Sequence, residues 1–314
     1  MRSVLVFALF FLLSGCIYVN VPLAPGPGPA EEKVVEGRGR AKIAVIDLDG
    51  RFMRRPEFLS RFSRGPSILE RFKEELQLAG GDGDVAGVVV RVDSPGGSVT
   101  VSDILYHEIK SFRARRQVPV VACIMDRAYS GGYYAAIGAA EIFAHPTSTI
   151  GGIGVISLNV DLSGLLQKWG VDVEIVKSGR YKDAWSPLRP SQPEETARMQ
   201  TVVDGLHDRF LDLVRQNRPV SAAHLAEVSK GGVFSARRAA ELGLVDRIGY
   251  LEDALARVRQ LAGVDEARVI IYRQPGAVAE TLYSSQGPWP PGMQSAAEVF
   301  NPLFDGRLRY FSLP

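Results

Sequence analysis

Dense apolar runs alternate along the chain with segments in which apolar residues recur at helical spacing. The runs at 42–48, 85–92 and 118–125 are short and rich in β-branched residues, as in strands that are buried on both faces. The segments 66–78 and 99–112 have the spacing of amphipathic helices. This succession predicts an α/β fold of stacked β-β-α units, with the active site at the strand ends.

Shorter elements are expected to continue this alternation. The small-residue segment 133–140 can form a helix that packs tightly against the sheet. Further strands are predicted at 141–144, 153–159 and 171–176, and further helices at 162–169, 236–242 and 251–261. Together these elements are enough for one large α/β core.

The clearest helix is predicted at 191–217. Ser191 and Glu194 match the capping-box pattern at its start. The apolar positions of the segment fall on one helical stripe, formed by Met199, Val202, Val203, Leu206, Phe210, Leu213 and Val214. A stripe of this kind packs either on the core of its own chain or on another subunit, and the pattern favours the core.

The first fifteen residues have the form of an export signal. Arg2 precedes a short apolar stretch at 4–13, which is too short to span a bilayer comfortably. The stretch ends in LSGC at 13–16, the pattern of a lipobox in which Cys16 receives the lipid. The alternative is an uncleaved anchor helix that runs on to Val21, but Asn20 and the small residues before Cys16 weaken that span.

Composition then divides the rest of the chain. Residues 16–40 are rich in Pro and Gly and then in charge, as in a tether. The peptidase domain is assigned to 41–273, and 274–314 to an irregular C-terminal extension. Apart from Cys16 the only cysteine is Cys123, which lies in a buried run, so no intramolecular disulfide is expected. A formal net charge of +2 gives no indication of nucleic-acid binding.

Two glycine-rich turns supply candidate chemistry. Ser130 follows the run at 118–125 and precedes a helix whose first N–H groups have no internal acceptor, so a serine nucleophile here would have donors for an oxyanion. The turn DSPGGS at 93–98 follows the run at 85–92 and can supply another N–H. Each turn also has a plain structural interpretation, Ser130 as a helix N-cap and 93–98 as an ordinary β-to-α turn.

A serine nucleophile needs a base, and no Ser/His/Asp set emerges from the four histidines. The better candidate is Lys182, which follows the predicted strand at 171–176. Keeping an ordinary lysine neutral near pH 7 costs about 4.6 kcal/mol, which burial can supply. Spacing and composition alone do not select Lys182, because a lysine in a charged loop is usually a solvated surface residue.

Five motifs in order carry a family resemblance. They are DSPGGS at 93–98, YSGGY at 129–133, GGIGV at 151–155, SGRYKD at 178–183 with SP at 186–187, and FS at 234–235 through GLVD at 243–246. Over about residues 42–275 the chain resembles the short, single-repeat bacterial form of signal peptide peptidase A. This resemblance implies a Ser/Lys-dyad peptidase of the Clp-protease and crotonase superfamily.

By matching position, the resemblance makes Ser130 the nucleophile, Lys182 the general base, and Gly97 and Gly131 the donors of the oxyanion N–H groups. It also implies a ring-like or dome-like homo-oligomer, in which the lysine of one protomer completes the serine site of its neighbour. The chain departs from the family pattern at Gly152. Relatives often carry there a serine that helps to hold the lysine, and Ser148, Thr149 or a water is a possible substitute.

The implied activity is that of a membrane-anchored endopeptidase that cleaves spent signal peptides and other apolar membrane-associated peptides. No metal or organic cofactor is implied, because no His/Cys/Asp cluster is present in the sequence. The catalytic domain is expected outside the cytoplasm, on the periplasmic side in a Gram-negative cell. Ile17 after Cys16 is not the aspartate that retains lipoproteins in the inner membrane, so the outer membrane is the default there.

Two alternative functions remain open at this stage. One is a dyad protease that cuts a specific membrane-protein partner. The other is a catalytically silent lipoprotein scaffold, an interpretation that Gly152 favours. Acyl-CoA chemistry of the crotonase type shares the glycine-turn scaffold, but export from the compartment that holds acyl-CoA argues against it.

Overall fold

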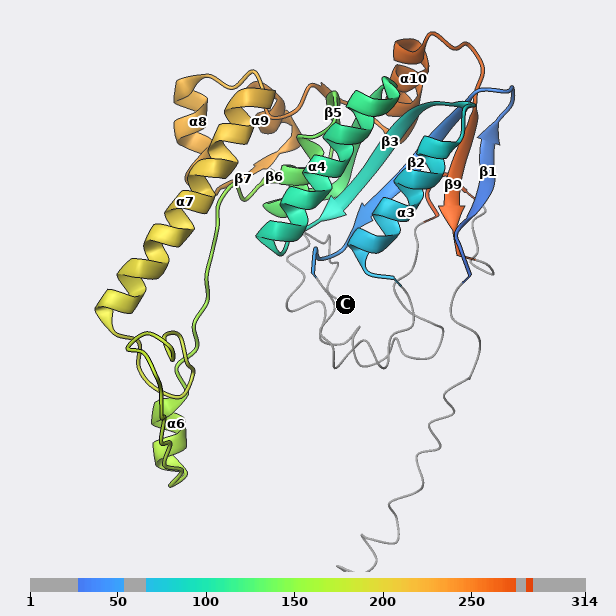
Figure 1. The fold of residues 1–314 in the computed structure, drawn as a ribbon. Helices are drawn as coiled ribbons and strands as arrows, with labels where there is room; N and C mark the ends of the chain where they lie inside the picture. The colour runs from blue at the N-terminus through green and yellow to red at the C-terminus, as the bar shows by residue number, and fades with distance from the viewer. Residues whose placement is uncertain (1–27, 54–65, 275–280, 285–314) are drawn as a thin grey trace, which may run out of the picture.

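A largely parallel sheet forms the centre of the protein (Figure 1). The computed structural model describes residues 28–53, 66–274 and 281–284. Seven strands of the sheet follow the order β1-β9-β2-β3-β4-β5-β8, and β6 and β7 extend it beside β4. The strands are β1 (Glu31–Gly37), β2 (Lys42–Asp49), β3 (Val85–Ser94), β4 (Val120–Tyr129), β5 (Glu141–Ala144), β6 (Thr149–Gly151), β7 (Val233–Ser235), β8 (Arg247–Ile248) and β9 (Arg268–Arg273).

Helices cover both faces of this sheet and confirm the predicted α/β class. They are α3 (Ile68–Gly81), α4 (Val99–Arg116), α5 (Gly131–Ala136), α6 (Ser163–Lys168), α7 (Pro193–Asn217), α8 (Ala222–Val228), α9 (Ala236–Glu241) and α10 (Leu251–Ala262). The helix α3 begins at a capping box in which the Ser67 side chain accepts from the Glu70 N–H. Figure 1 shows α3 and α4 side by side along one face of the sheet.

The central strands are buried on both faces, which explains why their sequences are almost continuously apolar. Along β3, Val88 and Val90 join the core under α3, α4 and α5, whereas Val89 points into the second core under α10. The strand pairs β2 with β3 and β3 with β4 are parallel. Their carboxyl ends therefore meet at one edge of the sheet, where the loops after β3 and β4 carry the two glycine turns.

The segment 31–37, which composition assigns to the tether, forms the edge strand β1 instead. It pairs antiparallel with β9 through its backbone, and most of its side chains are exposed. Charged side chains are common on such an edge, because backbone bonds rather than apolar burial hold the strand. The charged residues of 31–37 therefore gave no apolar pattern from which a strand could be predicted.

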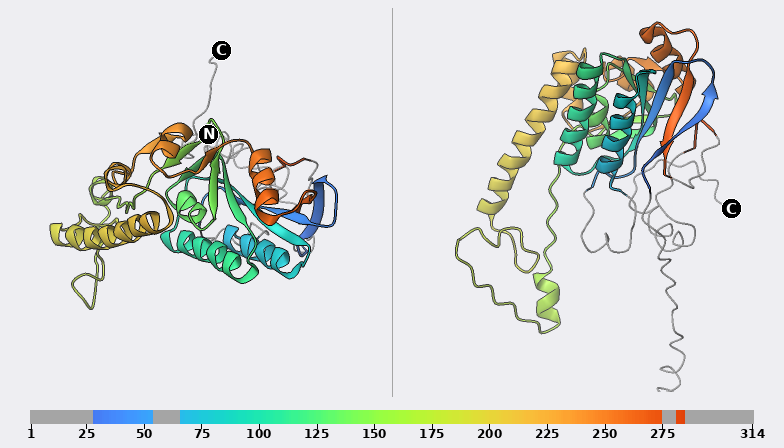
Figure 2. Two further views of the ribbon diagram at one scale, coloured as in Figure 1. Left: turned by 90° about the horizontal axis from the view of Figure 1, so that it is seen from above. Right: turned by 45° about the vertical axis from the view of Figure 1, so that its right-hand side comes forward.

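An arm formed by residues 156–192 projects from the sheet at the far end of α7 (Figures 1 and 2). The strands predicted at 153–159 and 171–176 are wrong, since both stretches lack strand structure beyond β6. Ile156 is 94% exposed and Val176 is 92% exposed. Their β-branched pattern suits a strand, but among the described residues the arm pairs with no strand of the sheet.

The helix α7 links this arm to the core. Its N-cap is Gln192 with Glu195 as the capping-box partner, so the predicted pair of Ser191 and Glu194 is wrong by one residue. The predicted core packing holds for the second half of the stripe, because Phe210, Leu213 and Val214 are buried. In the first half, Met199, Val203 and Leu206 are only half-buried and Val202 is exposed.

A buried polar cluster joins the end of the described chain to the sheet. The Arg91 side chain donates to both carboxylate oxygens of Asp47, at 2.7 and 2.9 Å. Arg91 also donates to the Leu282 carbonyl at 2.6 Å, and Arg273 donates to the Ser284 carbonyl at 2.5 Å. Leu282 itself is buried in the core under α10. Part of the region assigned to the irregular extension therefore packs as part of the domain.

Several sequence predictions lie outside the described residues. These are the signal at 1–15, Cys16, the first part of the tether and the extension from residue 285. Among the helices that the structure describes, none has the length and apolar content needed to cross a membrane.

Candidate active site

Ser130 lies at the turn between β4 and α5, and its backbone is strained. Its φ is 49° and its ψ is −117°, a combination that glycine usually occupies, as at the first central position of a type II′ turn. A strained residue of this kind costs about 1–3 kcal/mol, and such residues cluster at functional sites. Two hydrogen bonds hold the turn: the Ser130 N–H donates to the Gly151 carbonyl at 2.9 Å, and the Tyr134 N–H donates to the Ser130 carbonyl at 2.9 Å.

Ser130 occupies the N-cap position of α5, but it does not cap the helix with its side chain. Its side chain makes no capping hydrogen bond with α5, whereas Ser67, Ser221 and Ser235 do cap their helices. The Ser130 residue is half-buried at the carboxyl end of β4. The hydroxyl is therefore not used to cap α5.

The glycine turn after β3 lies directly against Ser130. A methyl group on Gly96 would lie 2.6 Å from the Gly131 nitrogen and 3.0 Å from the Ser130 Cβ, so only glycine allows this approach. Gly96 also has a φ of +87°. The Ser94 hydroxyl fixes the turn by donating to the Gly50 carbonyl at 2.6 Å and accepting from the Gly96 N–H at 3.0 Å. The sequence predicts a close backbone approach at both glycines of this turn, and the contact with the Ser130 turn lies at Gly96.

Gly97 and Gly131 are the two predicted oxyanion donors. Gly97 packs against Phe52, whose carbonyl oxygen would lie 2.3 Å from a methyl group at that position. Gly131 is the first residue of α5, where N–H groups have no acceptor inside the helix. Within the described residues, neither of these two N–H groups donates a hydrogen bond to the protein. No described residue therefore occupies the two predicted donor groups.

A third glycine turn, at Gly151 and Gly152, supports Ser130 from the other side. A methyl group on Gly152 would lie 3.3 Å from the Ser130 nitrogen, so the position borders the candidate nucleophile. The hydroxyl groups suggested as substitutes for a serine here have other partners. The Ser148 hydroxyl donates to the Met125 carbonyl at 2.6 Å, and the Thr149 hydroxyl pairs with the Tyr129 hydroxyl at 2.5 Å.

The structure does not bring Lys182 to Ser130 within one chain. Lys182 is exposed in the loop between α6 and α7, on the arm. Figure 1 shows that this loop lies at the far end of α7, away from β6. The strand β6 pairs with the last residues of β4, next to Ser130. Ser130, Gly96, Gly97 and Gly131 therefore form one site, and the predicted base stands apart from it.

Two of the four histidines, His145 and His107, and the buried cysteine have contacts of their own. His145 pairs with the Thr147 hydroxyl at 2.8 Å and packs on the Tyr250 ring, while His107 pairs with Ser111. Cys123 is completely buried in the core under α10, as predicted. Burial raises the pKa of its thiol to about 12, which makes it a poor nucleophile.

Comparisons with known proteins identify the family of the chain. A family model described as peptidase family S49 matches residues 113–265, a range that includes Ser130 and Lys182. An Enterococcus faecium protein named as a putative signal peptide peptidase SppA is 34% identical over 243 residues, which are 77% of this chain and 70% of that protein. The chloroplastic serine protease SPPA of Arabidopsis thaliana is 31% identical over 72% of this chain and 33% of that protein.

Among solved structures, a point mutant of the 1510-N membrane-bound stomatin-specific protease aligns with a TM-score of 0.45 and 15% identity. The alignment covers 74% of this chain and 98% of that one. The sequence similarity to the Enterococcus protein extends over most of both chains, and the family match contains the strained serine turn. The chain therefore belongs to peptidase family S49 and is a serine endopeptidase.

Proposed function

We propose that the protein cleaves peptide bonds through an acyl-enzyme on Ser130, with Lys182 as the general base. The observation that carries this proposal is the strained Ser130 turn, in which the Ser130 hydroxyl makes no capping hydrogen bond with α5. The N–H groups of Gly97 and Gly131 have no acceptor within the described residues. The Ser130 Oγ attacks the substrate carbonyl carbon and its proton passes to the Lys182 Nζ. The Gly97 and Gly131 N–H groups bind the oxygen that becomes negative.

The second half of the reaction uses the same groups. As the C–N bond of the substrate breaks, the lysine ammonium gives its proton to the leaving amine, and the acyl group stays on the Ser130 Oγ. The lysine then takes a proton from water, and the hydroxide attacks the ester carbon. The C–Oγ bond breaks, the acyl group leaves as a carboxylic acid, and the lysine ammonium returns its proton to the Ser130 Oγ. Each step needs a lysine Nζ within hydrogen-bond reach of the Ser130 Oγ.

A neighbouring copy of the chain is proposed to supply that lysine. Within one chain the arm that carries Lys182 projects away from the sheet. Apolar side chains on the arm are exposed, including Trp169, which is 74% exposed. A homo-oligomer would bury these side chains and place an arm beside the serine turn of its neighbour. A ring or dome of identical subunits would repeat this contact at every interface.

Spent signal peptides and other apolar membrane-associated peptides are the proposed substrates. This choice is supported by the name of the Enterococcus relative. A protease with one specific membrane-protein substrate is the alternative, and so is a catalytically impaired scaffold. Labelling separates the scaffold from both enzymes: a serine-directed phosphonate is expected to add to a single peptide that contains Ser130. An intact protein that takes up no label at Ser130 would exclude the acyl-enzyme.

Membrane attachment through a lipidated Cys16 is also a proposal, supported by the LSGC sequence at 13–16. Two or more acyl chains give stable anchoring where one does not. Mass spectrometry of the mature protein is expected to show an N-terminal Cys16 that carries a diacylglyceryl group. Recovery of an intact peptide beginning at Met1 would instead support an uncleaved anchor helix.

Gly96→Ala is expected to slow phosphonate labelling of Ser130 about 100-fold, because a displacement of about 1 Å at a reacting group has effects of this size. The new methyl group would collide with the Gly131 nitrogen and the Tyr129 carbonyl, at 2.6 and 2.8 Å. Gly83→Ala is the control, since nothing lies within 4 Å of a methyl group there. Labelling of Gly96→Ala at the rate of the control would show that this turn does not shape the site.

A further inference from the structure

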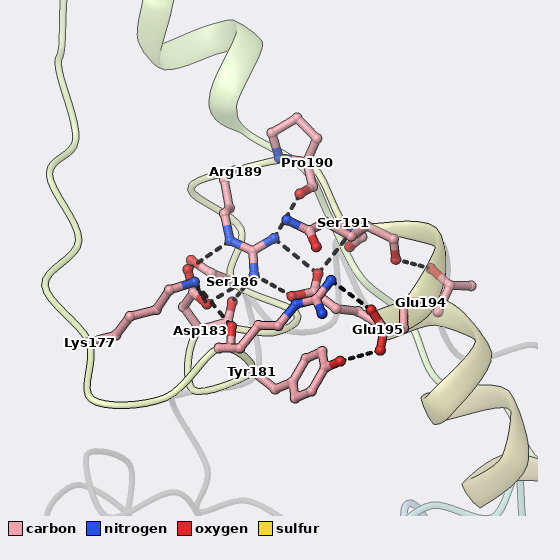
Figure 3. Close-up of polar contacts among 12 residues, drawn as sticks. Lys177, Tyr181, Asp183, Ser186, Arg189, Pro190, Ser191, Glu194 and Glu195 are labelled. Carbon is pink, nitrogen blue, oxygen red and sulfur yellow. Dashed lines mark hydrogen bonds and ion pairs between the residues drawn. The ribbon is translucent and has the colours of Figure 1, made fainter.

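Both sequence neighbours of Lys182 are held by polar contacts, Tyr181 with the start of α7 and Asp183 with residues of the loop (Figure 3). Lys182 itself is exposed. On one side, the Tyr181 hydroxyl donates to Glu194, and the Arg198 guanidinium lies over the Tyr181 ring, 4.4 Å from its centre. On the other side, Asp183 is bound by Arg189 and Lys177. The backbone is thus held on both sides of Lys182, and the Lys182 side chain is exposed.

Arg189 makes the larger share of these contacts. Its Nε and Nη2 donate to the two carboxylate oxygens of Asp183, at 2.7 and 3.0 Å. Its Nη1 and Nη2 also donate to the two carboxylate oxygens of Glu195, at 3.0 and 2.5 Å. The planar guanidinium can bind both carboxylates in this paired way, which a lysine ammonium cannot do. One side chain therefore ties the loop residue next to Lys182 to the first turn of α7.

The two carboxylates are well placed to hold Arg189. The Glu195 side chain is only 1% exposed and the Asp183 side chain 10%. Glu195 also accepts from the Gln192 N–H at 3.0 Å and so caps α7. Hydrogen bonds from Arg189, followed by one from Lys177, hold the pKa of Asp183 well below its usual range. Hydrogen bonds from Arg189 and then from the Gln192 N–H likewise lower the pKa of Glu195.

The backbone of the loop is strained close to this cluster. Trp185, three residues after Lys182, has a φ of +66°, which is rare for an aromatic residue. Such a conformation persists only when the surrounding contacts impose it. The Arg189 contacts span this residue, since Asp183 precedes it and Glu195 follows it. The loop therefore has a defined shape although it lies on a projecting arm.

We propose that Arg189 is a positioning residue for Lys182: by binding Asp183 and Glu195 together, it fixes the lysine-bearing loop on the rigid end of α7. This inference rests on the proposed role of Lys182 as the base. A long, flexible side chain can reach the Ser130 of a neighbouring copy at low entropic cost only if its backbone is already in place. Arg189 touches neither substrate nor the reacting atoms, and it acts through Asp183.

The test uses the oligomeric protein and a serine-directed phosphonate. For Arg189→Met we expect the maximal rate of Ser130 labelling to fall about 10- to 100-fold. The phosphonate concentration at half-maximal rate is expected to stay unchanged, because the probe binds at the serine turn. Millimolar guanidinium should restore part of the rate by occupying the vacated position, and Arg189→Lys should retain part of it. The proposal is contradicted if guanidinium restores no labelling, or if Arg189→Met changes the phosphonate concentration at half-maximal rate.

Arg238→Met is the matched control, because Arg238 also binds two carboxylates, Glu227 at 2.6 Å and Glu241 at 3.1 Å, but lies on α9. We expect it to be labelled at the wild-type rate. Asp183→Asn should slow labelling as well, and the double variant with Arg189→Met should be no slower than the slower single variant. Additive effects of the two changes would contradict an action through Asp183.

The outcomes also separate this inference from the proposed function. If Lys182→Ala is inactive and Arg189→Met is labelled at the wild-type rate, Arg189 has no positioning role and the proposed base stands. If Lys182→Ala itself is labelled at the wild-type rate, Lys182 is not the general base, and Arg189 then has no positioning role in the reaction. Size-exclusion chromatography of each variant establishes that the oligomer is intact before rates are compared.

Discussion

Ser130→Ala and Lys182→Ala are each expected to reduce peptide hydrolysis by about three to six orders of magnitude. Ser130 provides the atom that bonds to the substrate, and Lys182 accepts the proton without which the hydroxyl is a weak nucleophile. Because the two groups act as one unit, the double variant should be about as inactive as either single variant. Turnover of an apolar peptide, measured for all three variants, tests this expectation.

Both variants are expected to stay folded. Lys182 is exposed, and the Ser130 side chain does not cap α5. Thermal unfolding should therefore change little, and a loss of activity can be assigned to the chemistry. Lys168→Ala is the matched control, since Lys168 is an exposed lysine at the end of α6 on the same arm. Near-normal turnover by Lys182→Ala would show that another group is the base.

Mixing inactive Ser130→Ala protein with inactive Lys182→Ala protein is expected to restore activity. In a mixed oligomer some interfaces join an intact Ser130 turn to an arm that carries an intact Lys182. With random mixing of equal amounts, about one interface in four has both residues, so activity should approach a quarter of the wild-type value if the sites are independent. The activity of the mixture is measured after subunit exchange and compared with that of each variant alone.

The controls for the mixing experiment measure whether the oligomers form and dissociate as expected. Native mass spectrometry establishes that mixed oligomers form, and dilution of the wild type should lower its specific activity as the oligomer dissociates. Mixed oligomers that remain inactive would mean that Ser130 and Lys182 of the same chain meet. That result would require a rearrangement of the arm, because the single chain holds the lysine-bearing loop apart from the serine turn.

Local patterns were sufficient for the core of the fold. The strands β2, β3, β4 and β5 were predicted within a few residues, because dense β-branched runs have few alternatives to a buried parallel strand. The edge strand β1 was missed because its side chains are charged and its backbone bonds to β9 are distant in sequence. The arm was misread as containing strands because its apolar residues lack a partner in the single chain, and no periodicity in one chain reveals that.

In the site, too, local patterns predict some features, whereas contacts between other parts of the chain determine the rest. The turns at Ser130 and at Gly96 and Gly97 follow strands that pair in parallel, so their proximity follows from the order of local elements. The strain at Ser130 could not be read from residue types, since serine is also among the commonest N-cap residues. The Lys182 loop owes its shape to Arg189 and Glu195, and a motif match gives no indication of those contacts.

Two buried arginines, Arg91 of β3 and Arg273 of β9, determine where the folded unit ends. The guanidinium groups of Arg91 and Arg273 donate to the carbonyls of Leu282 and Ser284, so a protein shortened to the predicted boundary at residue 273 would lose these acceptors. An unsatisfied buried polar group costs about 1–3 kcal/mol, and a charged one costs more. A recombinant catalytic domain must therefore extend through Ser284, and an affinity tag fused directly after residue 274 would replace a structural segment of the protein.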